Sequence, residues 1–363
     1  MCVRISPKAC RTVSPGAEGK GGAGMRIGII ASIAHRTPPI SYGPWEQIAS
    51  NCAEGFVARG HEVTLFATAN SHTTAHLSGP VAEGYEEADG VDAKVAEALH
   101  LGSAFARAHE FDILLNHFDF MPLSYSRLVG TPMVTTIHGF SSEKIVPVYQ
   151  AYNDIAHYVA ISEANRHPAL TYAATIHHGI DTAAFTFSAA PEDFLLFLGR
   201  IHPDKGTHRA IEVARRAGVP LVVAGIIQDA DYFDSFVAPA IDGAAVTYVG
   251  AVDPAERDRL LGSARALLHL IAFEEPFGLS VVESLATGTP VIATTLGSMP
   301  ELIRDGVTGF LVADEDTAVT AVGRLPELAR QRCRDEAVSR FHVQRMVDTY
   351  LTLFADVVAG RPG

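Results

Sequence analysis

The chain has 363 residues, of which 48% are hydrophobic and 19% are charged, and its formal net charge is −13. This length suffices for two domains of ordinary size, and the acidic balance without a Lys/Arg block argues against a nucleic-acid surface. No apolar run reaches the ~18 residues of a membrane-spanning helix, and the scattered cysteines fit neither a disulfide framework nor a zinc site, which suits a cytoplasmic protein.

The first part of the chain predicts a sheet of parallel strands. Residues 1–24 are rich in Gly, Ser and Pro and lack an apolar stretch, so we expect a disordered extension there rather than a secretory signal. From Met25, apolar runs without polar alternation are separated by helical patterns, as in sheets buried on both faces. The expected strands are 25–32, 61–68, 112–117, 131–139, 157–162 and 173–178. The expected helices are 45–60, which Gly60 ends, and 91–110, with Val91, Val95, Ala98, Leu99 and Phe105 near one face.

The alternation restarts after a break near residues 187–192. The expected strands are 193–200, 220–225, 245–250, 264–270 and 289–295, and the expected helices are 208–218, 254–262 and 280–288. Residues 25–187 and 193–340 therefore predict two doubly wound α/β domains, with a ligand site between them at the carboxyl ends of the strands.

The last segment, 341–363, predicts a closing helix that packs back on the first domain. Its apolar residues repeat at helical spacing: Met346, Val347, Tyr350, Leu351, Phe354 and Val357.

The stretch EPFGLSVVE places Glu275 and Glu283 eight residues apart. Pro276 disfavours a helix at Glu275, so the helix is expected to begin near residue 278. The free N–H groups of a helix start form an anion site suited to a diphosphate, and Glu283 in the second turn could accept hydrogen bonds from ribose hydroxyls. The alternative is that both carboxylates are solvated surface acids.

The stretch GRIHPDKG, residues 199–206, carries Arg200 and Lys205 on one loop after a strand. A planar guanidinium and an ammonium beside a strand end provide counter-charge for phosphate. The alternative is a surface turn with two solvated cations.

Together, GRIHPDKG and the following EPFGLSVVESLATGTPVIAT resemble the retaining, nucleotide-sugar-dependent glycosyltransferases of family four (glycosyl transferases group 1). The segments PPISYGPWEQIASNCAEGFVARGHEVTLFAT, TTIHG, YVAISEANR and IHHGID extend the resemblance over nearly all of residues 25–360. It implies the GT-B fold, in which two Rossmann-like doubly wound domains face each other across a cleft and a C-terminal helix crosses back.

The resemblance implies catalytic roles for four residues. Arg200 and Lys205 correspond to the pair that neutralises the donor diphosphate. Glu275 corresponds to the first Glu, near the hydroxyls of the transferred sugar. His138, in TTIHG, corresponds to the first-domain His that reaches the donor sugar, usually around its 6-hydroxyl.

The implied donor-binding residues lie on one helix of the second domain and on the loop after the first strand. Backbone amides of the second-domain helix hold the diphosphate, Glu283 binds the donor ribose, and the loop after the first strand touches phosphate and acceptor. The residues of the amide group and of that loop are Gly278, Leu279, Ser280, Tyr42 and Gly43.

Some positions depart from the family pattern. Gly43 is followed by Pro44 and Trp45 rather than by a second glycine, Gly139 stands where an Asp is common, and His178 replaces the usual Asn before Gly-Ile-Asp. Trp45 is interpreted either as an acceptor contact or as packing at a helix start. These changes concern the acceptor side and leave the reaction class as predicted.

Three other groups of residues are candidate sites. Asp229-Ala230-Asp231 has the DxD pattern of another glycosyltransferase fold but is interpreted as loop acids or a helix start. His177 and His178 are interpreted as strand-end or loop histidines, because no Cys or Glu stands at zinc spacing. For His117 and Asp119, an acceptor-side role and a structural role both stay open.

The sequence thus predicts a retaining hexosyltransferase. It would move a sugar from a UDP- or GDP-sugar to a hydroxyl of a small-molecule, lipid-linked or glycan acceptor, with no metal ion and no cofactor besides the nucleotide diphosphate sugar. The alternative is a nucleotide-sugar-binding GT-B relative without transfer activity, either epimerase-like or inactive. The donor base, donor sugar, acceptor and oligomeric state are not predicted.

Overall fold

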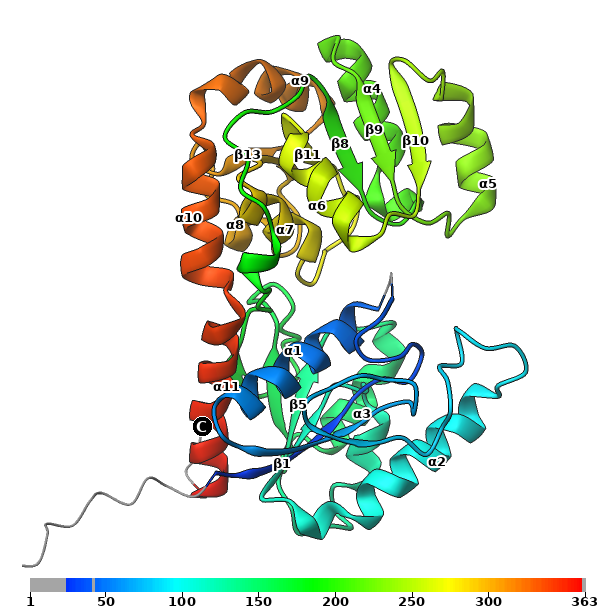
Figure 1. The fold of residues 1–363 in the computed structure, drawn as a ribbon, viewed down its shortest axis with the longest axis vertical. Coiled ribbons are helices and arrows are strands. Elements are labelled where there is room, and N and C mark those ends of the chain that lie inside the picture. Colours follow the sequence, from blue (N-terminus) through cyan, green and yellow to red (C-terminus); the bar gives the residue numbers. More distant parts are fainter. Residues whose placement is uncertain (1–23, 41–42, 361–363) are drawn as a thin grey trace, which may run out of the picture.

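The computed structural model describes residues 24–40 and 43–360. The predicted disordered extension, apart from its last residue, lies outside the described residues, and so does Tyr42. Two α/β domains follow one another along the chain, and Figure 1 shows the second above the first. Within the described residues, no helix is both long and apolar enough to cross a membrane.

The first domain is built on seven strands in the order β3-β2-β1-β4-β5-β6-β7, and every neighbouring pair is parallel. The strands are β1 Arg26–Ile30, β2 Glu62–Phe66, β3 His76–Ser78, β4 Ile113–Asn116, β5 Met133–Ile137, β6 His157–Ala160 and β7 Tyr172–Thr175. The parallel arrangement predicted from the unbroken apolar runs is confirmed, whereas the three-residue β3 was missed.

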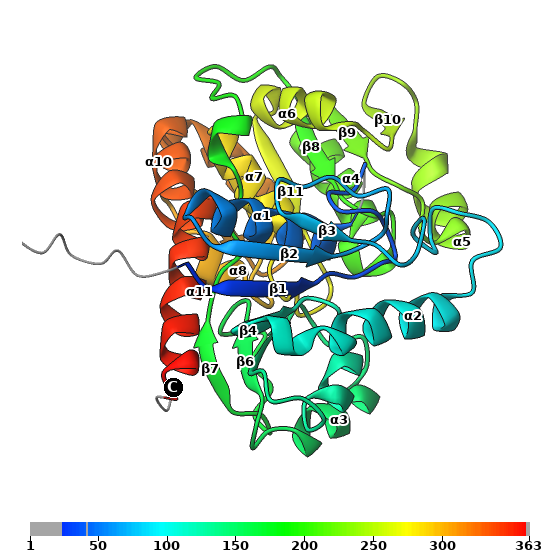
Figure 2. The same cartoon turned by 60° about the horizontal axis from the view of Figure 1, so that its bottom comes forward.

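Helices cover both faces of this sheet, as Figure 2 shows for α1 and α2. They are α1 Pro44–Ala58, α2 Ala93–Ala106 and α3 Val146–Ala151. The predicted apolar face of α2 is correct for Phe105, which is buried, but wrong for Val95 and Leu99, which are 58% and 56% exposed. The buried line contains His100 instead, whose Nε2 lies 3.0 Å from the carbonyl oxygen of Ala31.

The second domain has six parallel strands in the order β10-β9-β8-β11-β12-β13. They are β8 Leu195–Leu198, β9 Leu221–Ala224, β10 Val246–Gly250, β11 Ala266–His269, β12 Val291–Thr294 and β13 Gly309–Val312, of which β13 was missed. Its helices are α4 Thr207–Ala217, α5 Ala230–Tyr232, α6 Pro254–Ser263, α7 Leu279–Thr287, α8 Met299–Leu302, α9 Glu315–Arg324 and α10 Arg330–Phe341.

The last helix, α11 Val343–Val358, continues from α10 and runs along the first domain (Figure 1). It packs against α1, and Met346, Val347, Tyr350 and Phe354 are buried in the core of that domain, as the apolar pattern predicted. The Tyr350 hydroxyl lies 2.7 Å from Oγ1 of Thr136 on β5. The C-terminal helix therefore ties the second domain to the first.

The two domains also meet directly through polar contacts. Glu301, on α8 of the second domain, accepts hydrogen bonds from the backbone N–H groups of Glu163 and Ala164 and pairs with His177 Nε2 at 3.1 Å. Ser162 donates to the carbonyl oxygen of Pro276 at 2.7 Å. The loops that follow β6 and β7 are thereby held beside the segment predicted to bind the donor.

Candidate active site

The loop after β8 and the loop after β11 come together at one edge of the second sheet. Lys205, which ends the loop after β8, donates from Nζ to Oε2 of Glu275, and their side chains are only 14% and 12% exposed. The next residue must be glycine, because Gly206 has φ +69 and a Cβ there would lie 2.1 Å from the carbonyl oxygen of Leu270. The pairing of the two predicted motifs thus depends on close backbone contact.

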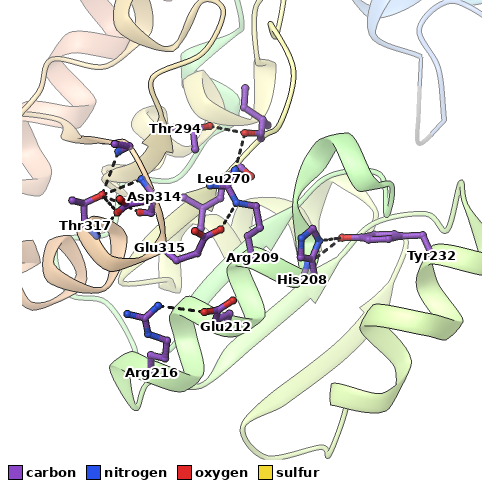
Figure 3. Close-up of polar contacts among 12 residues, drawn as sticks. His208, Arg209, Glu212, Arg216, Tyr232, Leu270, Thr294, Asp314, Glu315 and Thr317 are labelled. Carbon is purple, nitrogen blue, oxygen red and sulfur yellow. Dashed lines mark hydrogen bonds and ion pairs between the residues drawn. The ribbon is translucent and has the colours of Figure 1, made fainter.

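Arg209, in the first turn of α4, stabilises the same edge. Its guanidinium pairs with Glu315 at the start of α9 and donates to the carbonyl oxygens of Leu270 and Ile271, at 3.2 and 3.1 Å (Figure 3). The end of β11, from which the Glu275 loop departs, is therefore fixed to α4 and α9.

Glu275 is largely buried and nevertheless held ionised. Burial by itself would raise its pKa, but His269 and Lys205 outweigh burial and lower the pKa of Glu275 to about 2. Nε2 of His269, the last residue of β11, lies 3.6 Å from Oε2 of Glu275. His269 was not among the residues predicted from the sequence, although a polar residue at the carboxyl end of an apolar strand is a recognisable signal.

The start of α7 lies directly after Glu275 in the chain. Gly278 is its N-cap with φ +96, and a Cβ there would lie 2.9 Å from Cε of Met299. Leu279 and Ser280 are the first helical residues, so their backbone N–H groups lack partners within the helix. This is the amide group that the sequence predicted, on a helix of nine residues.

Two further predicted residues carry protein partners. Glu283 is buried in the second turn of α7 and pairs with Arg257 of α6 at 3.3 Å. Burial raises the pKa of Glu283, and Arg257 opposes that rise. Arg200 donates from Nη1 to Oε1 of Gln228, so it shares a loop with Lys205 but contacts a different residue. The sequence pointed to neither Arg257 nor Gln228.

His138 follows β5 in the first domain and lies between two other histidines. Its Nε2 is 2.8 Å from Nδ1 of His117, and its Nδ1 is 3.2 Å from Nε2 of His178. The next residue, Gly139, has φ +151, and a Cβ there would lie 3.1 Å from Cγ of Pro276. His138 and Glu275 therefore lie on loops that touch, and this tight contact favours glycine where the family often has Asp.

The start of α1 also contributes to this region. Gly43 caps the helix with φ 152, and a Cβ there would lie 2.8 Å from Cβ of Pro39. Trp45 stacks on His138 with ring centroids 5.1 Å apart, so it packs at the helix start and also on a predicted site residue. The predicted contact of Tyr42 falls outside the described residues.

The remaining candidates have local partners. Asp229 caps α5 by accepting from the N–H of Tyr232, as its interpretation as a helix start required, and it lines a surface pocket of about 380 Å³ that includes His202 and Gln228. Asp119 has φ +103 and accepts from the Tyr149 hydroxyl at 2.5 Å. Burial raises the pKa of Asp119 to about 6.

Comparison with known proteins identifies the family. Residues 46–184 match the family described as Glycosyltransferase Family 4, and residues 183–337 match that described as Glycosyl transferases group 1. The chain belongs to the GT-B glycosyltransferases of family four. The recognition made from GRIHPDKG and EPFGLSVVE is thereby confirmed.

Two curated relatives illustrate the range of this glycosyltransferase family. Glycogen synthase of Mycobacterium tuberculosis is 26% identical over an alignment of 377 positions, gaps included, which covers 84% of this chain and 88% of the relative. D-inositol 3-phosphate glycosyltransferase of Mycobacterium avium is 36% identical over 130 residues, which cover 34% of this chain and 31% of the relative.

Solved structures confirm the predicted GT-B fold of this glycosyltransferase. Sucrose-phosphate synthase from Thermosynechococcus elongatus aligns with a TM-score of 0.77 at 18% identity, covering 93% of this chain and all of the other. Anabaena HepE, solved in complex with UDP and glucose, aligns with a TM-score of 0.72 at 19% identity, covering 91% and 99%.

Proposed function

We propose that this glycosyltransferase transfers a hexose from a nucleotide diphosphate sugar to an acceptor hydroxyl with retention of anomeric configuration, and that it needs no metal ion. The observation that carries the proposal is the contact between Lys205 and Glu275 immediately before the start of α7. It joins a cation, a carboxylate held ionised and a set of free helix amides within one short stretch of structure.

The cationic groups retain capacity for a diphosphate. A lysine ammonium has three N–H donors and a guanidinium has five, whereas Lys205 gives one to Glu275 and Arg200 gives one to Gln228. Breaking the bond from the sugar C1 to the diphosphate leaves negative charge on the leaving group. Donors preorganised around that charge stabilise the transition state, and the amides of Leu279 and Ser280 at the positive end of the α7 dipole add to them.

Glu275 suits the binding of hydroxyls better than attack on the sugar. An ionised carboxylate only accepts hydrogen bonds, so Glu275 can hold sugar hydroxyls in position. Its charge is already engaged by Lys205, with His269 nearby, which weakens it as a nucleophile of the kind retaining hydrolases use. We therefore propose same-face attack by the acceptor, assisted by the leaving phosphate. Closure of the domains around the donor would exclude water.

The first domain supplies His138, which we propose lies against the transferred sugar. Gly139, the residue after it, touches Pro276, so a sugar held by Glu275 would lie near the His138 loop. Glu283 is proposed to hold the donor ribose while it is paired with Arg257.

The cytoplasmic location expected from the sequence remains a prediction.

The test is a panel of UDP-, GDP- and ADP-sugars, each measured by thermal shift and by release of nucleotide diphosphate, with and without EDTA. UDP-glucose is the first donor to try, because HepE structures hold UDP and glucose or UDP-glucose. Stabilisation by one nucleotide family, unchanged by EDTA, together with an acceptor product of the donor's anomeric configuration in proton NMR, supports the proposal.

The alternative function predicts a different pattern in the same panel. A relative without transfer activity would be stabilised by a nucleotide sugar but release no nucleotide diphosphate in the presence of any acceptor. Loss of turnover on EDTA treatment, restored by a divalent ion, would contradict the metal-independent mechanism.

A further inference from the structure

Three histidines from three strand ends of the first domain form one continuous chain. His117 follows β4, His138 follows β5, and His178 follows β7. Because His117 and His178 each contact a different nitrogen of His138, at 2.8 and 3.2 Å, the central ring has both of its nitrogens engaged. Within the described residues, the outer atoms His117 Nε2 and His178 Nδ1 have no hydrogen-bond partner.

The chain of three histidines is buried and uncharged. The three side chains are 0%, 8% and 4% exposed, in the order His117, His138, His178. Burial lowers the pKa of His117 and of His178 to about 3 and lowers that of His138 well below its usual value, so all three are neutral near pH 7. Over residues 24–40 and 43–360, no three His, Cys, Asp or Glu side chains are grouped to hold a metal ion.

Neutral histidines in such a chain have only two proton arrangements. Each ring carries one N–H, and each of the two N···N contacts needs one proton. His138 must therefore donate to one neighbour and accept from the other. In one arrangement all bonds point towards His178, whose Nδ1 then carries the spare N–H; in the other they point towards His117, whose Nε2 carries it.

The His178 end of the histidine chain lies beside the predicted donor-binding segment. The ring of His178 lies edge-on to Phe277, with centroids 5.0 Å apart, and Phe277 stands between Glu275 and Gly278. Trp45 covers the face of His138. The orientation of His138 is thus fixed by hydrogen bonds at both nitrogens and by stacking on its face.

We infer that His117, His138 and His178 act as one hydrogen-bonded unit, in which His117 and His178 are positioning residues that fix the ring orientation and tautomer of His138. This inference rests on the proposed function, because His138 is the residue proposed to lie against the transferred sugar. It gives a positioning function to His117 and His178, neither of which has a role in the proposed transfer.

Amide substitutions can separate this role from simple packing. An Asn amide takes the place of a histidine Nδ1, and a Gln amide takes the place of Nε2, and either can donate or accept. His117 uses Nδ1 towards His138, whereas His178 uses Nε2. H117N and H178Q therefore preserve the chain, while H117Q and H178N break it.

We expect kcat to fall by roughly tenfold or more in H117Q and H178N, and by less than about threefold in H117N and H178Q, with little change in donor KM. His100 provides the control, because it is equally buried in the first domain but bonds to a backbone carbonyl. H100N and H100Q should leave kcat within about threefold. If Asn is better than Gln at both positions, or Gln is better at both, the inference is wrong, because side-chain size would then explain the result.

A second measurement does not depend on turnover. In protein labelled with ¹⁵N-histidine, ring nitrogen shifts distinguish N–H from bare nitrogen, and His138 should show one of each. H178N should change the ring signals of His117, whose hydrogen bond is to His138 and not to His178, while H178Q should leave them as in the wild type. Unchanged His117 signals in H178N would overturn the inference.

The two readouts separate failure of the inference from failure of the proposed function. If no nucleotide sugar is turned over but the His117 signals respond to H178N, the inference about the three histidines is supported and the transferase proposal fails. If the wild type transfers sugar and the His117 signals do not change in H178N, the transferase proposal is supported and the inference about the three histidines fails. Thermal unfolding of each variant identifies any that do not fold.

Discussion

Replacing Lys205 with Met should remove part of the stability that Glu275 gives the fold. Lowering the pKa of Glu275 from 4.5 to about 2 corresponds to roughly 3 kcal/mol in favour of the ionised folded state. The pKa is depressed on folding, so this stabilisation is complete above pH ~4.5 and is lost as the pH falls towards ~2. Lys205 supplies only part of it, since His269 remains beside the carboxylate. We expect K205M to lose about 1–3 kcal/mol of unfolding free energy at pH 7, between the values for exposed and fully buried pairs.

The assay is urea unfolding of wild type, K205M and K94M at several pH values between 7 and ~2, so that the range includes the folded-state pKa of Glu275. Lys94 is exposed on α2, so K94M makes the same charge change away from the site. The deficit of K205M should be largest at pH 7 and shrink in acid, while K94M should follow the wild type. Curves for K205M and wild type that fall in parallel across this range would refute the coupling of Lys205 to Glu275.

The same variant tests the proposed chemistry. Loss of one preorganised donor to the leaving diphosphate should lower kcat by roughly 10²–10³-fold, far more than the loss of stability would explain. Unchanged turnover in a folded K205M protein would remove Lys205 from the mechanism.

Three further predictions concern neighbouring groups. G139A should lose about 1–3 kcal/mol of unfolding free energy because its φ is +151, whereas G102A, in an open helical position, should gain up to ~1 kcal/mol in the same thermal unfolding assay. R257M should raise the pKa of Glu283 further, so its stability deficit, about 1–2 kcal/mol, should be larger at pH 7 than at pH 4.5 in urea. Burial raises the pKa of Asp119 to about 6, so its carboxyl stabilises the fold below pH ~3.8 and loses that effect as the pH rises through ~6. The Asn of D119N does not titrate. The unfolding free energy of D119N, measured against that of wild type, should therefore rise by about 1–3 kcal/mol when the pH is raised from 4 to 7.5.

Much of the fold could be predicted from local pattern. Apolar runs without polar alternation mark strands covered on both faces, and the doubly wound arrangement followed from their alternation with helices. The short strand β3 escaped because its three residues carry little periodicity, whereas β13 escaped although it is as long as several strands that were predicted. Val95 and Leu99 were wrongly placed on the buried face of α2. His100 is buried there instead and bonds to a backbone carbonyl, and hydrophobicity alone does not count a histidine as a core residue.

The candidate site was predictable only where one motif contains the residue. GRIHPDKG and EPFGLSVVE named Lys205 and Glu275, and the fold then placed them in contact. Their partners come from elsewhere: His269 from the end of β11, Arg257 from α6 and Gln228 from the loop after β9. His269 ends the strand that leads into the Glu275 loop, so its position could have been predicted. No spacing in the sequence links Arg257 or Gln228 to the motifs, because the fold and not the local chain brings them together.

The pairing of site groups with one another bears on how a donor would bind. Lys205 contacts Glu275, Arg257 contacts Glu283, and both nitrogens of His138 contact other histidines. An uncompensated buried charge would destabilise the empty protein by several kcal/mol, so these pairs let a preorganised site persist without ligand. A donor diphosphate or hydroxyl must then add to, or exchange with, an existing partner. Binding of that kind favours ligands that match charge and donor pattern together, because a ligand that matches only one leaves a protein group unpaired.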